Sequence, residues 1–366
     1  MITYNDIFNK IKLHQRISTD DAIYLYEHAT LGELAVMADI RRRKFNGDNI
    51  YYIKNIHIEP TNICQNRCKF CSYRRAEGDS DTYKLSHEQI IDRIKVAGDI
   101  SEVHIVGGLH PDYNLDFYTT LFSSIRKQFP KIHRKGLTAE EIKYLSELSG
   151  KTYTEVLQAI VNSGLQSMPG GGAEIFDPEI RNKICPDKLS GEDWLKIHEV
   201  AHTLGIITNA TMLYGHIENT LHRIKHLEAI RNLQDKTKGF NAFIPLKYRL
   251  SENQLGLTNE VSIIDDLRTY AISRIFLDNI PHIKAYWPML GLQKALLMTS
   301  FGADDLDGTI SQSTEIYSTT GNIGKDGIST QELCLAIQAE GKTPIERDSY
   351  YNAISIDTQK VKSINC

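Results

Sequence analysis

Three cysteines lie close together in the segment Cys64-Gln-Asn-Arg-Cys68-Lys-Phe-Cys71, directly after the strand-like run 55–60. Structural zinc ions take four protein ligands, and iron–sulfur clusters are normally held by four thiolates. Three thiolates on one short loop, with no fourth nearby in the sequence, favour a 4Fe–4S cluster with one open iron. Such an iron can bind a small molecule through nitrogen and oxygen and pass it an electron. Three unremarkable thiols, or a zinc site completed by a distant histidine, are the alternative interpretations.

Other residues with chemical potential also follow predicted strands. Gly107 and Gly108 come before His110, and their lack of a Cβ lets the backbone approach a ligand closely. Glu174 follows the glycine run 170–172, where its carboxylate could accept hydrogen bonds from a ribose diol. A bare turn and a surface glutamate are the alternative interpretations of these two features.

Further along the chain, the candidates become less specific. Arg181 could meet a ligand carboxylate through its forked guanidinium, or it could lie at the surface. The run 208–216 alternates polar and apolar residues, includes Met212, and ends at His216. That histidine could be a ligand, a proton donor or a polar residue satisfied within the fold. The segment 286–289 could line an apolar pocket or pack in the core.

The composition is that of an ordinary globular enzyme. The 366 residues are 41% hydrophobic and 24% charged, and the formal net charge is −4, which gives no reason to expect a nucleic-acid partner. No run of 18 apolar residues predicts a membrane span, and the N-terminus lacks the pattern of a secretory signal. Because an exposed low-potential cluster needs reducing surroundings, a cytoplasmic location is expected.

The elements that must position these residues alternate between strands and helices, as in parallel βα units. The expected strands span 52–60, 102–108, 132–137, 166–176, 206–216, 240–248, 283–288 and 303–308. We therefore expect an α/β fold with a TIM-type (β/α) barrel, partial to complete. Residues 1–50 are expected to form a helical N-terminal extension, 51–290 the barrel core, and 291–366 a mixed C-terminal extension that completes or caps it. In such barrels the chemistry lies on the loops after the strands.

The cysteine motif, with Phe70 before its last cysteine and Gly107-Gly108 after the next strand, resembles the radical S-adenosylmethionine superfamily. The resemblance implies that the open iron binds the amino and carboxylate groups of S-adenosylmethionine. An external low-potential donor such as flavodoxin or ferredoxin then supplies an electron, and cleavage of the sulfonium gives a 5′-deoxyadenosyl radical. The resemblance also implies a set of S-adenosylmethionine contacts: Tyr73, Gly107, Gly108, Glu174, Arg181 and Met212.

A wider set of segments, from about residue 20 to 350, resembles the aminodeoxyfutalosine synthase family of menaquinone biosynthesis. Its selective parts are Glu174-Ile-Phe and His216-Ile-Glu218, accompanied by the segment 282–287. The resemblance implies that the adenosyl radical adds to the enol ether of 3-[(1-carboxyvinyl)oxy]benzoate. Rearrangement and loss of carbon dioxide then give 6-amino-6-deoxyfutalosine. Besides Arg181, the candidates for holding the two substrate carboxylates are the catalytic residues Arg74, His110 and His216.

One stretch departs from this pattern, because residues 133–138 read His-Arg-Lys-Gly-Leu-Thr where a Lys-Ala-aromatic sequence is expected. Alternative functions are a related radical cyclase of the same pathway, a deazaflavin-cofactor synthase, and a redox or zinc protein without radical turnover. A nucleic-acid-modifying radical enzyme is disfavoured, since the sequence shows no appended RNA-binding module and the net charge is negative.

Overall fold

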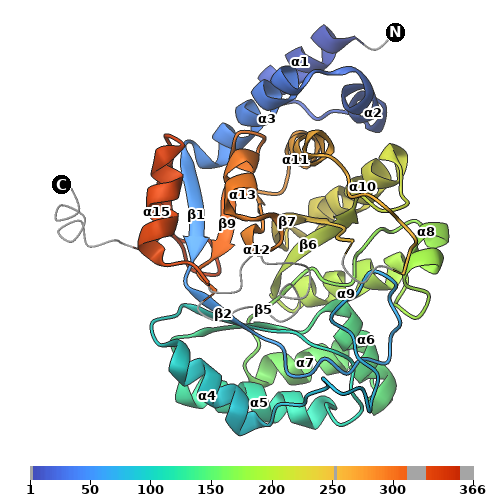
Figure 1. Cartoon of the computed structure of the whole chain (residues 1–366), viewed down its shortest axis with the longest axis vertical. Coiled ribbons are helices and arrows are strands. Elements are labelled where there is room, and N and C mark those ends of the chain that lie inside the picture. Colours follow the sequence, from blue (N-terminus) through green and yellow to red (C-terminus); the bar gives the residue numbers. More distant parts are fainter. Residues whose placement is uncertain (1–2, 251–253, 311–326, 355–366) are drawn as a thin grey trace.

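The computed structural model describes residues 3–250, 254–310 and 327–354. Helices α1 (Tyr4–Lys12), α2 (Thr19–His28) and α3 (Leu31–Asn46) form the helical N-terminal segment at one end of the molecule (Figure 1). Capping boxes at Ser18 and Thr30 begin α2 and α3, because each hydroxyl and the acidic residue three positions later satisfy the first amides. Of the described helices, none combines the length and apolar character needed to cross a bilayer.

A parallel seven-stranded sheet in the order β2-β3-β4-β5-β6-β7-β8 forms the centre of the fold. The strands are β2 (Asn55–Ile58), β3 (Glu102–Ile105), β4 (His133–Gly136), β5 (Ser167–Met168), β6 (Ile207–Tyr214), β7 (Phe240–Lys247) and β8 (His282–Ile283). The helices between them are α4 (His87–Ala97), α5 (Leu115–Gln128), α6 (Ala139–Ser149), α7 (Tyr153–Ser163), α8 (Pro178–Ile184), α9 (Gly191–Thr203), α10 (Thr220–Thr237) and α11 (Ile263–Phe276). The chain order follows the sheet order, so the predicted α/β barrel architecture is confirmed.

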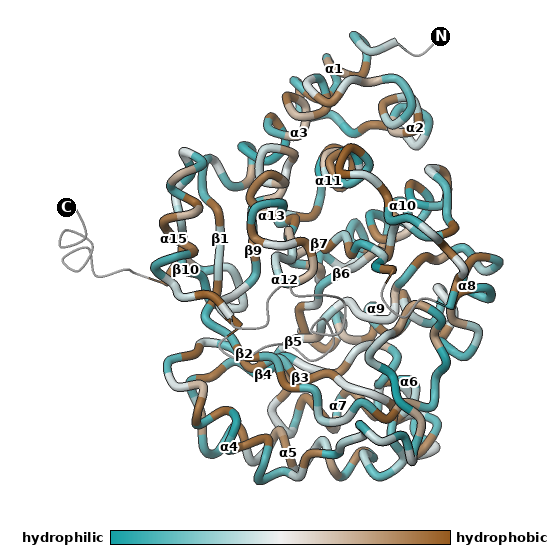
Figure 2. The backbone as a smooth tube through the Cα atoms, in the orientation of Figure 1, coloured by the Kyte–Doolittle hydropathy of each residue, from teal (hydrophilic) through white to brown (hydrophobic). Residues whose placement is uncertain are grey.

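The helices bury one apolar stripe each against this sheet. On α5, for example, Leu115, Tyr118, Leu121, Phe122 and Ile125 are buried at the spacing of one helix face. Figure 2 shows the resulting alternation of polar and apolar residues along the helices that surround the strands. The apolar core therefore lies between the sheet and its helices.

A second, three-stranded parallel sheet has the order β10-β1-β9 and contains β1 (Asn49–Ile53), β9 (Asp305–Gly308) and β10 (Thr343–Glu346). The amide of Asp304 donates to Ile283 O at 3.0 Å, and the amide of Ala285 donates to Asp305 O at 2.7 Å. On the other side of the β9 segment, the amide of Tyr51 donates to Asp304 O at 2.7 Å. The β9 segment thus connects the β8 edge of the large sheet to β1, which leads directly into β2.

The expected strands are longer than the observed ones; 102–108, for example, is shortened to β3. The predicted strand 52–60 is two strands, β1 and β2, that belong to different sheets. The predicted strand 166–176 is paired only over β5, since its glycine run forms a turn. The predicted strand 283–288 is only the short β8, because Pro288 favours the start of helix α12 (Trp287–Leu290), which α13 (Leu292–Thr299) follows. The expected strand 303–308 is shortened to β9, and α15 (Thr330–Ala339) leads to β10.

Candidate active site

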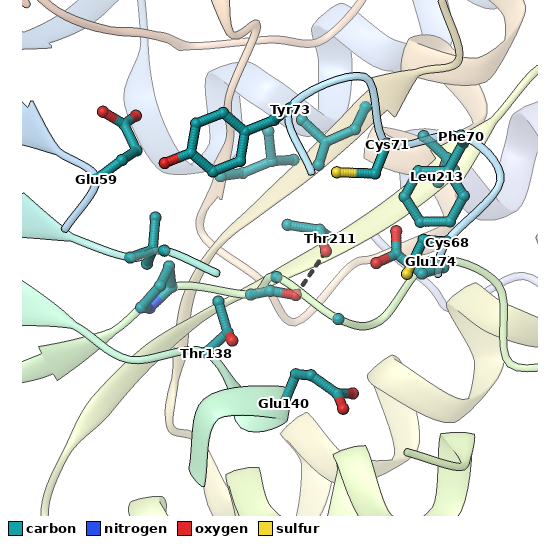
Figure 3. Close-up of a pocket in the computed structure, with 18 of the residues that line it drawn as sticks. Glu59, Cys68, Phe70, Cys71, Tyr73, Thr138, Glu140, Glu174, Thr211 and Leu213 are labelled. Carbon is teal, nitrogen blue, oxygen red and sulfur yellow. Dashed lines mark hydrogen bonds between the residues drawn. The ribbon is translucent and has the colours of Figure 1, made fainter. Parts of the chain in front are cut away.

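A cavity of about 310 Å³ opens at the carboxyl ends of the barrel strands. Its wall comes from the loops after β2, β3, β4 and β5 and from side chains of the strands themselves. Figure 3 shows Cys68, Cys71 and Phe70 gathered near Glu174 at one end, with Glu59 at the other. The loops that were expected to carry the chemistry therefore meet around one space.

The cysteine loop, residues 64–71, is anchored to its neighbours by backbone and side-chain hydrogen bonds. Cys64 N donates to Arg75 O at 3.1 Å, and Lys69 N donates to Ile184 O at 2.8 Å. Within the loop, Asn66 Nδ2 donates to Glu140 Oε1 at 2.9 Å, which ties it to the start of α6. These bonds fix the loop without using the thiols.

Gly108 packs directly beneath the cysteine loop. A Cβ at this position would lie 2.1 Å from Ile63 O and 3.2 Å from Cys64 Cβ. The amide of Gly108 donates to Thr61 O at 2.9 Å, while Gly107 N donates to Glu141 Oε1 at 3.2 Å. The glycine pair therefore supports the loop by close backbone contact, as its lack of side chains suggested.

The three thiols suit an iron–sulfur cluster. Cys64, Cys68 and Cys71 are free cysteines that all line the cavity, and burial raises the pKa of the Cys68 and Cys71 thiols. Within the described residues, no three His, Cys, Asp or Glu side chains are gathered as around a single metal ion. The ligands of a cubane cluster each bind a different iron, so they need not converge on one point. Cys185 is buried and Cys334 is half-buried.

Glu174 stands at the end of a glycine turn that faces the cysteines. Its backbone has a φ of +45°, and its carboxylate accepts from Lys188 Nζ at 2.5 Å. The same ammonium lies 5.4 Å from the Phe70 ring centroid, so it connects Glu174 to the cysteine loop. Thr211 Oγ1 donates to Gly170 O at 2.6 Å and holds the turn against β6 (Figure 3).

Besides Cys64 and Cys68, six other predicted site residues line the cavity. They are the cluster ligand Cys71, the S-adenosylmethionine contacts Tyr73, Gly107, Gly108 and Glu174, and the catalytic candidate Arg74. Tyr73 is buried, and its hydroxyl donates to Thr61 O at 2.8 Å. The Arg74 guanidinium donates through Nε to Cys64 O at 3.2 Å, which leaves it beside the first cysteine. The loop after β2 thus contributes both the thiols and a cation.

Arg181 and Met212 lie outside the set of residues that line the cavity. The buried Arg181 guanidinium donates to Ala173 O at 2.5 Å and to Ile175 O and Gly172 O at 3.2 Å, and it also donates to Leu189 O. It therefore supports the glycine turn from behind. Met212 is buried in the apolar core, because strand alternation turns it away from the face that carries Thr211.

Two predicted histidines are likewise not brought to the cavity wall. His110 is buried, and its Nδ1 accepts from Asp112 N at 3.1 Å. The His216 ring donates through Nε2 to Leu213 O at 3.1 Å, with Nδ1 3.1 Å from a Glu218 carboxylate oxygen. Both rings take part in local turns, and their substrate contacts remain predictions.

Sequence reasoning missed the inner end of the cavity. Four polar residues line it there: His57 on β2, the half-buried His104 on β3, Lys135 on β4, and Lys284 directly after β8. The signal was the alternation of polar residues within three short strands, Asn55/His57, Glu102/His104 and His133/Lys135, which indicates a polar barrel interior. The segment 133–138, where the sequence departs from the family pattern, supplies Lys135 and Thr138 to this wall.

The fold and the site define a class of protein, the barrel enzymes that hold an iron–sulfur cluster on a three-cysteine loop. The family described as the radical SAM superfamily matches residues 58–230, and the CofH/MqnC C-terminal region matches residues 237–360. The chain belongs to the radical SAM superfamily, in the group whose members carry this C-terminal region. Enzymes of this family use a 4Fe–4S cluster and S-adenosylmethionine, for which Cys64, Cys68 and Cys71 are present here.

Relatives with three different activities cover most of the chain. An aminodeoxyfutalosine synthase of Thermus thermophilus is 37% identical over 96% of this chain and 95% of its own length. A 5-amino-6-(D-ribitylamino)uracil–L-tyrosine 4-hydroxyphenyl transferase of Methanopyrus kandleri is 36% identical over 86% and 87%. A cyclic dehypoxanthine futalosine synthase of Streptomyces coelicolor is 35% identical over 93% and 86%. The identities are too similar to select one activity.

A solved structure of methylornithine synthase shares the fold with a TM-score of 0.75. The alignment covers 92% of this chain and 97% of the other, at 15% sequence identity. At this identity the likeness concerns the arrangement of strands and helices alone.

Proposed function

We propose that this enzyme is an aminodeoxyfutalosine synthase. It adds the 5′-deoxyadenosyl group to the enol ether of 3-[(1-carboxyvinyl)oxy]benzoate and forms 6-amino-6-deoxyfutalosine after rearrangement and decarboxylation. The observation that carries the proposal is the presence of Arg74 and the unpaired Lys135 among the acidic and basic residues of the cysteine cavity, because a substrate with two carboxylates needs cationic partners. Arg74 lies on a loop of the cavity and Lys135 on β4, while Lys284 follows β8 and is paired with Asp307. The similarity to the Thermus synthase over nearly the whole chain supports it.

Different parts of the cavity would bind S-adenosylmethionine and the enol ether. Cys64, Cys68 and Cys71 would hold the cluster, which when bound supplies the electron that cleaves the sulfonium. Glu174 and the glycine turn before it would hold S-adenosylmethionine beside the cysteines. The barrel interior would orient the alkene against the 5′ carbon and exclude water, because positioning supplies most of what the protein adds to such chemistry.

The reaction needs an electron donor and reducing surroundings. An external low-potential donor such as flavodoxin or ferredoxin supplies the electron that reduces the cluster, and the radical formed after decarboxylation returns an electron, so the overall reaction is redox-neutral. A reducing compartment, the cytoplasm, keeps the cysteines available for the cluster. The substrates are small molecules, and the reaction needs neither a nucleic acid nor a membrane.

The product assay tests the proposal directly. The anaerobically reconstituted enzyme is reduced and incubated with S-adenosylmethionine and the enol ether, and the products are read by mass. We expect 6-amino-6-deoxyfutalosine, with methionine as co-product. Free 5′-deoxyadenosine as the main product, without an adenosyl adduct, would refute the proposal. Iron and sulfide analysis accompanies the assay, with about four iron atoms per chain expected for a cubane cluster.

The similarity to relatives with other activities supports a second candidate in the same family. In that case the enzyme takes a different acceptor and uses the adenosyl radical for hydrogen abstraction. Two parallel incubations distinguish this candidate, one with L-tyrosine and 5-amino-6-(D-ribitylamino)uracil and one with dehypoxanthine futalosine. Turnover in either incubation, without turnover of the enol ether, would favour it.

A further inference from the structure

Three neighbouring strands bring His57, His104 and Lys135 into one row inside the barrel. His57 lies opposite His104 in the register of β2 and β3, and His104 lies opposite Lys135 in that of β3 and β4. The residues before and after the histidines, such as Ile56 and Val103, pack in the apolar core. Strand alternation therefore turns the row to the opposite face, where all three side chains line the cavity.

Lys135 is the unusual member of the row. It is 7% exposed, yet no described residue forms a hydrogen bond or an ion pair with its ammonium. Two other lysines of this cavity are paired, Lys284 with Asp307 at 2.5 Å and Lys247 with Asp266 at 2.8 Å. Glu102 lies two residues before His104 on β3 and attracts Lys135 electrostatically, but the two form no ion pair.

His104 adds a second polar atom without a partner. Its Nε2 is buried and makes no hydrogen bond within the described structure, while its Nδ1 lies 3.4 Å from His57 Nε2. Burial lowers the pKa of both imidazoles, that of His57 to about 4, so the rings are neutral at neutral pH. A neutral imidazole protonated on Nε2 can donate one hydrogen bond to a ligand.

The Lys135 ammonium and the unpartnered His104 Nε2 together form a site for an anion when that nitrogen carries the ring proton. Burying either group without a partner costs free energy, and such groups cluster where a ligand supplies the missing partner. We propose that Lys135 and His104 bind the ring carboxylate of the benzoate substrate. This inference rests on the proposed function, which supplies a substrate with a carboxylate at its aromatic end.

The position of the row within the barrel selects this carboxylate. His104 and Lys135 lie within strands, whereas the cysteines and Glu174 lie on loops beyond the strand ends. The alkene must meet the 5′ carbon of S-adenosylmethionine near the cysteines. The enol-ether carboxylate is next to the alkene and stays at the mouth, so the ring carboxylate is the group that points inward.

Two substrates and one substitution test the inference. The holoenzyme and its Lys135→Met variant are assayed for kcat/KM with 3-[(1-carboxyvinyl)oxy]benzoate and with 2-phenoxyacrylate, which lacks the ring carboxylate. We expect the unmodified enzyme to prefer the benzoate by roughly 10- to 100-fold, the effect of hydrogen bonds to a charged group. In the variant the preference should fall below about threefold. A variant that keeps the original preference, or loses activity equally on both substrates, would overturn the inference.

A matched control removes another lysine from the same cavity. The double variant Lys247→Met/Asp266→Asn deletes a paired cation together with the charge of its partner, so it leaves no bare buried ion. It should keep the preference for the ring carboxylate. Loss of the preference in this control as well would mean that the general positive potential of the cavity, and not Lys135, recognises the ring carboxylate. Lys135→Gln serves as a second variant, and iron content reports whether each protein assembles its site.

A binding measurement separates this inference from the proposed function. Calorimetry with the S-adenosylmethionine-loaded holoenzyme compares 3-hydroxybenzoate with phenol, and neither probe needs to react. Tighter binding of 3-hydroxybenzoate, abolished by Lys135→Met, supports the anion site even if no adenosyl adduct forms. Equal affinities of the two probes for the unmodified enzyme would overturn the site even if the adduct forms.

Discussion

At the scale of single residues, the interior of the protein shows how buried charges are balanced. Arg274 and Asp304, Lys284 and Asp307, and Arg347 and Asp305 are ion pairs between side chains that are at most 4% exposed. Lys135 has no such partner within the described structure, so its charge must be stabilised by longer-range attraction or by a ligand.

Lys135→Met should stabilise the enzyme at pH 7. Burial lowers the pKa of Lys135 from 10.5 to about 8, so folding at neutral pH buries a charge that prefers water. The penalty is fully present below pH 8 and vanishes as the pH rises through the unfolded value. A shift of this size corresponds to at most about 3 kcal/mol. We expect denaturant unfolding to show a gain of about 1–3 kcal/mol at pH 7 that shrinks towards pH 10.

The exposed Lys127 on α5 provides the control for this measurement. Lys127→Met should change the free energy of unfolding by less than about 0.5 kcal/mol at either pH. A loss of stability in Lys135→Met at pH 7 would show that the ammonium has a stabilising partner in the folded enzyme.

Glu174→Gln should weaken S-adenosylmethionine binding without loss of the cluster. The glutamate lines the cavity near the cysteines but is not one of the predicted ligands of the cluster. Its carboxylate accepts a hydrogen bond from Lys188 Nζ at 2.5 Å. Loss of a charged hydrogen-bond acceptor should lower the affinity about 10-fold or more. Equilibrium dialysis of S-adenosylmethionine and iron analysis measure the two effects. Glu179→Gln, at an exposed position on α8, is the control, and an unchanged affinity in Glu174→Gln would leave the glutamate a structural role.

At the scale of elements, the site depends on turns whose missing side chains let loops meet. Gly108 lies under the cysteine loop, and a Cβ at Gly170 would lie 2.7 Å from Asn209 O on β6. Both contacts are with backbone atoms, which cannot rotate away as a flexible side chain can. Close backbone packing at Gly108 and Gly170, in the loops after β3 and β5, therefore fixes the position of the cysteines and of Glu174.

Gly108→Ala should therefore reduce cluster assembly. The new methyl group would lie 2.1 Å from Ile63 O, so the cysteine loop must shift. We expect reconstituted iron to fall well below that of the unmodified enzyme, with Cys64→Ala as the reference for a lost ligand. Gly32→Ala is the matched control, because a Cβ there meets nothing within 4 Å on helix α3. A normal iron content in Gly108→Ala would show that the loop adapts without losing its ligands.

At the scale of the whole molecule, the C-terminal segment connects both ends of the barrel sheet. The β9 segment bonds to the β8 side and to β1, while β10 pairs with β1. Arg347, which follows β10, donates through Nε to Asp305 on β9 at 2.6 Å, and both side chains are buried. Arg347 and Asp305, 42 positions apart in the sequence, thus join β10 to β9 beside the β8 edge of the large sheet.

Arg347→Met should destabilise the enzyme by about 3–5 kcal/mol, because it leaves Asp305 as a buried, unpaired charge. Adding Asp305→Asn should recover much of this loss, since the second substitution removes the uncompensated charge. Guanidinium unfolding of the two single variants and the double variant forms the required cycle. Additive losses would indicate that the pair does not act as a unit.

The sequence by itself determined the features that depend on local spacing. The cysteine loop, the glycine pair at 107–108, the capping boxes and the alternation of strands and helices are all local patterns. They identified the family, the barrel and the ends of the strands that carry the chemistry. Cys64, Glu174 and Arg74 then met at one cavity because the carboxyl ends of parallel strands lie on the same side.

Tertiary structure decided which polar side chains face that cavity. Arg181 is bound to backbone carbonyls behind the glycine turn, and His216 is held by its own loop, although both follow strands as predicted. Lys135 and Lys284 are 149 positions apart and enter the same interior only when the sheet curls. Spacing along a chain fixes which residues share a strand face, but the neighbours across that face come from other strands, and only their packing determines which charges remain without a partner.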